Sequence, residues 1–224
     1  MTLKNIFLAG MSALGIGTAA TGAPPVTTLN SKSINFTMPT VAADELQFEM
    51  PTAKTFEGAP QFHEDEWRQV EFYPLSRLDE IQKRLKEFKA FEKDNRIKYG
   101  WKDIYARRIA GVSVLDTAGT TDLAGFLRGP VRPAPILTTS SAPLGQVKGG
   151  FTIRVTDSVF LYGIASGPTV TSLAAIVERG GDDLALTAAF SRMNQKYKVM
   201  LVDWRGQMVL TGVEANGGIE VWRP

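Results

Sequence analysis

The sequence contains no cysteine among its 224 residues. This absence excludes disulfide bonds, thiol nucleophiles, thiolate zinc sites and lipid attachment through a cysteine side chain. Histidine is nearly absent as well, because His63 is the only one in the chain. A Ser-His-Asp triad would have to use His63. No serine lies in the Gly-x-Ser-x-Gly turn that positions the nucleophile in many hydrolases.

A charge surplus of one sign is also lacking. The chain has 25 basic and 23 acidic residues, so its net charge is only +2. Such a small surplus does not predict binding to nucleic acid, which requires a concentrated basic surface. The 44% hydrophobic content is typical of a globular protein, and the length fits one large domain or two small ones.

No hydrophobic run is long enough for a stable transmembrane helix, which needs about 20 apolar residues. The nearest approach is residues 1–23, where Lys4 precedes a short apolar run and small residues follow at 18–23. This order is typical of a secretory signal peptide, with cleavage favoured after Gly22. We therefore expect a periplasmic or secreted protein without a stable span after cleavage. An uncleaved anchor and a buried N-terminal helix are the alternatives.

Residues 24–60 are interrupted by five prolines and predict a flexible, Pro/Thr-rich tail. A short motif, Phe-x-Met-Pro-Thr, occurs twice in this segment. Proline-stiffened segments with an aromatic anchor suit docking into a groove, because they lose little chain entropy on binding. The motif residues are therefore the candidate partner-binding residues: Phe36, Met38, Pro39, Phe48, Met50 and Pro51. A duplicated linker, or two short strands packed on the body, is the alternative interpretation.

The clearest secondary-structure signal is a helix over about 76–97. Apolar residues recur at spacings of three and four along it, namely Leu78, Ile81, Leu85, Phe88 and Phe91. That spacing places them on one helical face. Ser76 is predicted to cap the helix, with Asp79 three residues later, and Gly100 to close it.

Further elements follow from alternation and turn signals. Strands are expected at 67–73, 104–115, 151–155, 159–164, 197–202, 208–213 and 219–222. Shorter helices are expected from Thr171 or Ser172 to Val177 and from 182 to 193, and residues 129–150 are expected to form a long irregular loop. The Asn216-Gly217 pair is a strong hairpin signal, and the last strand is expected at a sheet edge.

Together these elements predict an α+β protein. Its sheet is expected to be mixed but mainly antiparallel, with one long amphipathic helix and one or two shorter helices, behind an extended N-terminal tail. The predicted organisation is a signal peptide at 1–23, a tail at 24–60 and an α+β domain at 61–224. Two lobes divided by the loop at 129–150 remain an alternative.

Candidate catalytic and metal-binding residues are few. His63 begins an acidic cluster, 63–66, which lacks the ligand spacing of a calcium loop. We predict no metal site and no cofactor, and we interpret the cluster as solvated charge. Carboxylates at predicted element ends could serve a glycosidase, which needs two acids about 5–10 Å apart. These acids are Asp116, Asp157, Glu178, Asp182, Asp183 and Asp203. Four tryptophans could stack on a ligand, but core packing is the commoner role.

Three hypotheses for the function follow. The favoured one is an exported, non-enzymatic protein that binds a protein partner in the cell envelope or secreted space, with the N-terminal tail as its docking segment. The second is a periplasmic hydrolase that uses paired carboxylates, with loop 129–150 as a lid. The third is an immunity or inhibitor protein that presents a charged face to its target.

Overall fold

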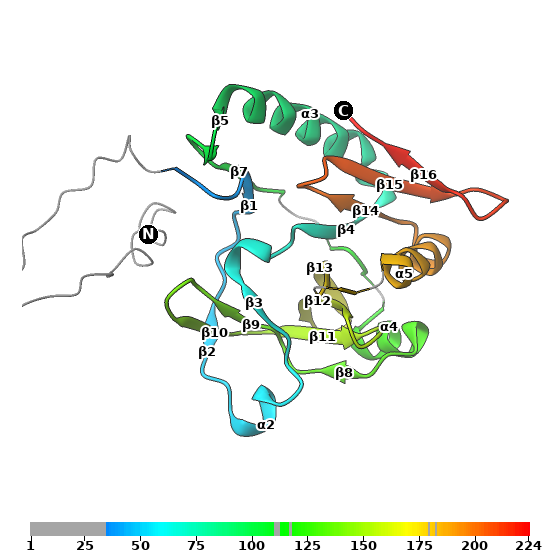
Figure 1. Cartoon of the computed structure of the whole chain (residues 1–224). Helices are drawn as coiled ribbons and strands as arrows, with labels where there is room; N and C mark the ends of the chain where they lie inside the picture. The colour runs from blue at the N-terminus through cyan, green and yellow to red at the C-terminus, as the bar shows by residue number, and fades with distance from the viewer. Residues whose placement is uncertain (1–34, 110–112, 117, 179, 182) are drawn as a thin grey trace, which may run out of the picture.

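The computed structural model describes residues 35–109, 113–116, 118–178, 180–181 and 183–224 (Figure 1). The fold is α+β, as predicted, and its strands pair mostly antiparallel. The predicted signal peptide lies outside the described residues. Within the described part of the chain, no helix has the length and apolar character needed to cross a membrane.

An antiparallel sheet of eight strands forms the centre of the molecule, in the order β16-β15-β14-β4-β13-β12-β11-β8. In chain order its strands are β4 (Val70–Pro74), β8 (Val131–Arg132), β11 (Gly150–Arg154), β12 (Val159–Ser166), β13 (Thr169–Val177), β14 (Val199–Asp203), β15 (Met208–Val213) and β16 (Ile219–Trp222). Five of the predicted strands correspond to β11, β12, β14, β15 and β16, and the one at 67–73 to β4. The final strand β16 lies at an edge, as expected.

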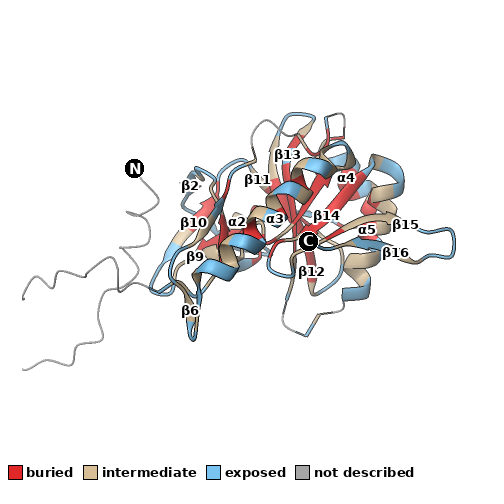
Figure 2. Cartoon of the chain, turned by 90° about the horizontal axis from the view of Figure 1, so that it is seen from above, coloured by how far each residue is buried: buried red, intermediate tan, exposed pale blue. Residues whose placement is uncertain are grey.

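Alternation along the central strands gives the sheet two buried faces. On β4, Phe72 joins the cluster that packs under α4 (Thr120–Leu127) and α5 (Asp183–Tyr197). Its neighbour Tyr73 joins the cluster that packs under α3 (Leu78–Asn95). Because successive side chains of a strand point to opposite faces, α3 lies on one side of the sheet, and α4 and α5 lie on the other. Figure 1 shows α3 above the sheet and α4 and α5 below it, and Figure 2 shows that the central strands are largely buried.

The α3 helix confirms the predicted apolar stripe. Ile81, Leu85 and Phe88 are buried, and Leu78 and Phe91 pack beside them. The predicted bounds of about 76–97 agree with this helix to within about two residues, but the predicted caps are wrong. Ser76 lies inside a 3-10 turn, η4 (Leu75–Arg77), so its hydroxyl is not at the cap position. At the other end the chain leaves the helix at Arg96 and enters a small hairpin of β5 (Arg96–Ile97) and β6 (Gly100–Trp101).

A second sheet of four strands shares the α3 side of the large sheet, in the order β2-β10-β9-β3. Its strands are β2 (Phe48–Glu49), β3 (Gln61–His63), β9 (Ile136–Thr138) and β10 (Pro143–Val147). Leu137 and Val147 of this sheet pack against Tyr162 and Ala174 of the large sheet. The predicted irregular loop at 129–150 is therefore wrong, since it contains the strands β8, β9 and β10.

Two other expectations differ from the structure. Residues 171–177 belong to strand β13 and not to a helix, because the Gly167-Pro168 turn folds them back onto β12, where Leu173, Ala174 and Ala175 are buried. Within the described part of the strand expected at 104–115, β7 covers Tyr105–Arg107, and Leu115 makes an isolated bridge to Val170. Short apolar runs fit either secondary structure, and here the tertiary contacts decide.

The predicted tail also differs over its described part, residues 35–60. Strand β1 (Thr40–Ala42) pairs in parallel with β7, and both Thr40 and Val41 are buried. Strand β2 pairs with β10, and the short helix α2 (Ala53–Phe56) follows it. This part of the chain is therefore not a free tail, because its backbone groups find partners on the body.

Candidate functional site

The first copy of the repeated motif attaches the N-terminal segment to the body. Phe36 exchanges backbone hydrogen bonds with Trp101, at 2.8 and 3.0 Å. Pro39 is buried, and its carbonyl accepts a hydrogen bond from the Tyr105 amide at 2.9 Å. Met38 is half-buried between these two attachment points. The residues of this copy therefore already contact the body of the same chain, and they are not free to bind a partner.

The second copy of the motif has a different environment. Phe48 is 36% exposed and Met50 is 87% exposed, while Pro51 is half-buried. Phe56 of α2, a few residues further along, is 51% exposed. Strand β2 stands at the edge of the four-stranded sheet, so only one of its sides is paired with another strand in the described chain. We call Phe48, Met50 and Phe56, together with β2, the β2 surface.

Gly145 of β10 allows β2 to lie close beside it. A Cβ atom at this position would come within 2.9 Å of the Glu49 carbonyl oxygen and 3.1 Å of the Phe48 Cβ. Gly145 also has a φ of +127°, a conformation that side chains with a Cβ rarely adopt. The position of the β2 surface therefore depends on the absence of a side chain at Gly145.

We expect Gly145→Ala to detach β2 from β10 and to cost about 1–3 kcal/mol of folding free energy. Hydrogen exchange of peptides covering residues 46–50 would show the loss of protection. Gly167→Ala is the matched control, since Gly167 also has a positive φ, +58°, but a Cβ there would meet nothing within 4 Å. Equal loss of protection in both variants would contradict the role of close approach.

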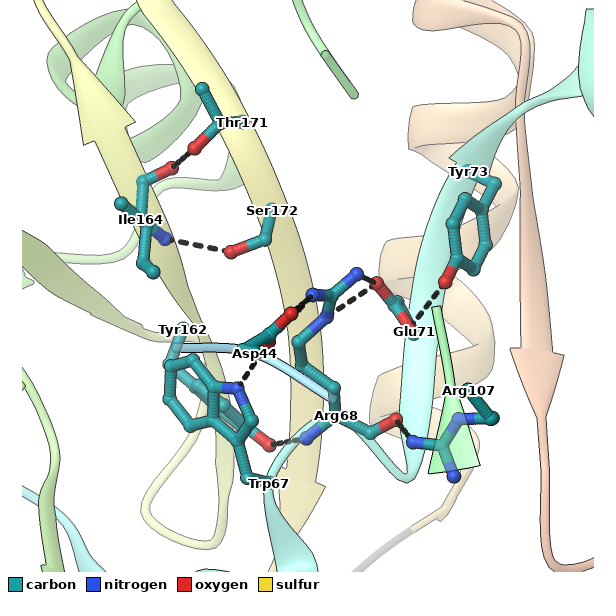
Figure 3. A network of polar contacts seen from close by, with 10 residues as sticks. All are labelled: Asp44, Trp67, Arg68, Glu71, Tyr73, Arg107, Tyr162, Ile164, Thr171 and Ser172. Atoms are coloured by element: carbon teal, nitrogen blue, oxygen red, sulfur yellow. Dashed lines mark hydrogen bonds and ion pairs between the residues drawn. The ribbon is translucent and has the colours of Figure 1, made fainter. Parts of the chain in front are cut away.

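A network of polar residues, in which Trp67, Glu71 and Tyr73 are buried, fixes the segment that leads to the β2 surface (Figure 3). Arg68 donates to Asp44 at 2.6 Å and to Glu71 at 2.6 Å. Trp67 donates its indole N–H to the same Asp44 at 2.8 Å, and Tyr73 donates its hydroxyl to Glu71 at 2.6 Å. Asp44 lies just before β2, so the network connects this segment to central strand β4.

Burial and charge shift the pKa values within this network. Burial alone would lower the pKa of Arg68, but the nearby carboxylates of Glu71 and Asp44 outweigh it and raise that pKa. Burial, reinforced by the charge of Glu71, raises the pKa of the Tyr73 hydroxyl well above its usual value. Arg68 therefore stays charged and Tyr73 stays a neutral donor throughout the physiological pH range.

The network lies between two apolar clusters on the α3 side of the sheet. Tyr73 belongs to the cluster under α3, whereas Trp67 and Tyr162 belong to the cluster under the four-stranded sheet. The Tyr162 hydroxyl accepts a hydrogen bond from the Arg68 amide at 2.9 Å and donates to the Glu66 carbonyl at 3.1 Å. We call this network the polar seam; it consists of Asp44, Trp67, Arg68, Glu71, Tyr73 and Tyr162. It positions the four-stranded sheet, and with it the β2 surface, against the large sheet.

The structure places His63 between a serine and an aspartate. Its Nε2 atom lies 3.3 Å from the Ser140 hydroxyl, and its Nδ1 atom lies 3.3 Å from the Asp65 carboxylate. The Asp65 backbone N–H donates to Nδ1 at 3.2 Å, so a neutral ring carries its proton on Nε2. That proton faces Ser140, and the ring then donates to the serine and does not act as its base. The local role is to join β3 to the 139–142 turn.

Burial raises the pKa of Glu64 and of Asp65 in the same acidic segment. Both belong to the 3-10 turn η3 (Glu64–Glu66). Glu66 pairs instead with Arg205 of the β14–β15 turn. Within the described residues, no group of three or more His, Cys, Asp or Glu side chains is placed to hold a metal ion.

Three of the carboxylates considered for a hydrolase, Asp116, Asp157 and Asp203, do not meet. Asp116 follows Leu115, which bridges Val170, whereas Asp157 precedes Val159, which pairs with Val177. They therefore lie at opposite ends of β13, about 20 Å apart at 3.3 Å per residue. Asp157 is 98% exposed and pairs with Arg154. Asp203 lies two strands away from β13 and accepts a hydrogen bond from the Gly206 amide in its own turn. Glu178 and Asp183 are exposed, and Asp182 lies outside the described residues.

Comparison with protein-family models, with curated proteins and with solved structures finds no match for this chain. The candidate site is therefore defined by its own geometry. Sequence reasoning identified Phe48 and Met50, but it did not identify Phe56, nor the network of Asp44, Arg68 and Glu71. The only local signal for that network was the spacing of Arg68 and Glu71, which sequence alone does not distinguish from a surface pair.

Proposed function

We propose that the protein is a non-enzymatic binding protein and that the β2 surface docks an extended segment of a protein partner. The exposed apolar side chains of Phe48, Met50 and Phe56 beside an unpaired strand edge carry this proposal. An edge strand offers backbone donors and acceptors to an incoming strand, and adjacent apolar side chains supply anchors. Affinity would come mainly from burial of Phe48 and Met50.

The surface is suited to docking because its support is rigid. Only the exposed side chains need to be ordered on binding, since the polar seam and Gly145 already fix the backbone beneath them. Pre-organisation of this kind reduces the entropy cost of association. Export to the periplasm or beyond, suggested by residues 1–23, belongs to the same proposal, and fractionation of cells that express the full chain would test it.

Paired-carboxylate hydrolysis is less well supported. It needs two acids about 5–10 Å apart, whereas Asp116, Asp157 and Asp203 lie on separate parts of the large sheet. The proposed lid at 129–150 contains three strands, β8, β9 and β10, that are built into the two sheets. A lid needs a segment that can open without disrupting the sheets.

Site-specific photo-crosslinking tests the docking surface directly. A benzophenone side chain at position 48 is expected to give a discrete adduct with one partner in an extract of the source cells. The same group at position 99 should give none, because Tyr99 is 78% exposed but lies on the β5–β6 hairpin. Deletion of residues 24–60 is unsuitable as a test, since it removes the buried strand β1.

Point variants complete the experiment. Phe48→Ser and Met50→Ser together should reduce capture of the crosslinked partner at least tenfold, because each buried apolar side chain contributes about 1.5–3 kcal/mol. Tyr99→Ser should leave capture unchanged. Equal adducts at positions 48 and 99, or unchanged capture by the double variant, would contradict docking at the β2 surface.

A further inference from the structure

A pocket of about 390 Å³ lies between α3 and β7, separate from the β2 surface. This volume is within the range of small-molecule sites. Arg107 and Trp204 line it, Tyr105 and Ile109 add apolar surface, and Arg84 and Arg108 also line it. We call it the Arg107 pocket.

Arg107 is a buried cation without a carboxylate of its own. It is only 5% exposed, and its hydrogen bonds go to neutral groups. These are the Arg68 carbonyl at 2.7 Å, the Thr40 hydroxyl at 2.9 Å and the Gln69 side-chain oxygen at 3.4 Å. Glu71 directs both of its carboxylate oxygens to Arg68 and Tyr73 instead. A charge buried in this way is costly unless an anion compensates it.

Two residues that line this pocket each have a buried hydrogen-bond donor without a partner in the described chain. These donors are the Nε–H of Arg107 and the indole N–H of Trp204. The two side chains stack, with the Arg107 guanidinium carbon 4.9 Å from the centre of the Trp204 ring. Buried donors are nearly always satisfied in native proteins, so two unsatisfied donors from one stacked pair indicate a missing acceptor.

The remaining charges favour an anion as that acceptor. Arg84 and Arg108 add positive charge to the lining, while Glu80, its one acid, is already paired with Arg77. Arg84 has a carboxylate partner, Glu87, at 3.1 Å, but that pair is partly exposed. Burial lowers the pKa of Arg107 to about 10, so this guanidinium still carries its charge at neutral pH. Arginine is well suited to hold carboxylate and phosphate groups.

We propose that the Arg107 pocket binds a small organic anion. Its carboxylate or phosphate group meets the positive charge of Arg107, Arg84 and Arg108, and its apolar part rests against Tyr105 and Ile109. The bound anion supplies the acceptor that the Arg107–Trp204 pair lacks once a small shift of these side chains exposes the two donors, which are buried in this structure. The pocket is a second binding site, and it does not depend on the docking proposal.

Titration of the full chain with phenyl phosphate, benzoate and neutral benzyl alcohol, at constant ionic strength, tests this proposal. The readouts are the nuclear magnetic resonance signals of the Arg107 Nε–H and the Trp204 indole N–H. At least one anion is expected to shift them saturably, and the comparison of phenyl phosphate with benzoate identifies the preferred group. Benzyl alcohol should leave both signals in place.

Variants at the accessible arginines separate a binding role from a structural one. Arg84→Gln and Arg108→Gln should each weaken binding about tenfold or more, because each removes a charge-assisted contact. Arg96→Gln is the matched control, since Arg96 is an exposed arginine just past the end of α3 that lines a different pocket. Three results would overturn the proposal: no saturable shift with either anion, an equal shift with benzyl alcohol, or Arg84 and Arg108 variants that bind no more weakly than Arg96→Gln.

Discussion

Glu71→Gln is expected to lower the free energy of unfolding by about 3–5 kcal/mol, the usual cost of removing one partner from a buried ion pair. Glu71 is only 1% exposed, and it accepts hydrogen bonds from both Arg68 and Tyr73. The glutamine keeps the shape but removes the charge, and its amide N–H₂ then faces one of these donors. Arg68 would be left with Asp44 as its only carboxylate partner.

Urea denaturation followed by tryptophan fluorescence measures this change. Asp157→Asn serves as the control, because it also removes the acid from an Arg–acid pair three residues apart, but in an exposed turn. Exposed pairs contribute about 0–1 kcal/mol, so the control should unfold at nearly the wild-type urea concentration. A Glu71→Gln protein within about 1 kcal/mol of wild type would show that the polar seam is not a major source of stability.

Gly163→Ala is the second substitution for which we expect a large effect, a loss of about 3 kcal/mol at the upper end of overpacking costs. Gly163 lies inside β12 and pairs with Leu173 of β13. A Cβ atom there would lie 1.9 Å from the Ser172 carbonyl oxygen and 2.7 Å from its carbon. These are backbone atoms of a central strand, so they can move only if the hairpin separates.

Thermal unfolding followed by circular dichroism compares this variant with Gly125→Ala. Gly125 lies in α4, and a Cβ there would meet nothing within 4 Å. Alanine should therefore stabilise that helix by about 0.5–1 kcal/mol, since it loses less conformational freedom on folding than glycine does. The two glycine-to-alanine changes are thus expected to shift the melting temperature in opposite directions. Similar shifts would contradict the close approach of β12 to β13.

Elements defined by local signals were predicted well. Helix α3 has a long apolar stripe, and β14, β15 and β16 are separated by turns with clear sequence signals at Trp204–Gln207 and Asn216–Gly218. In both cases the information lies within a short window of sequence. Residues 171–177 were predicted incorrectly because a short apolar run has no distinguishing period, and pairing with β12 and β4 decides its conformation.

The segment at 129–150 shows that glycine and proline do not by themselves identify an irregular loop. They were interpreted as signs of a loop, but Gly145 permits close contact with β2, and Gly150 begins β11 where a Cβ would meet Val147 and Ala134. The polar seam could not be predicted either, because Asp44, Arg68, Arg107 and Tyr162 are distant in sequence. The sequence identified the residues of the repeated motif as candidates, but it did not predict that one copy would pack on the body while the other stayed exposed.

The position of β4 in the large sheet has a consequence for how the chain folds. Strand β4 comes from the first half of the sequence, yet both of its neighbours, β13 and β14, come from the second half. During synthesis β4 is made long before either neighbour, and until then both of its edges lack partners. Such non-local pairing gives a high contact order and slow folding. The sheet can close around β4 only once nearly the whole chain has been made.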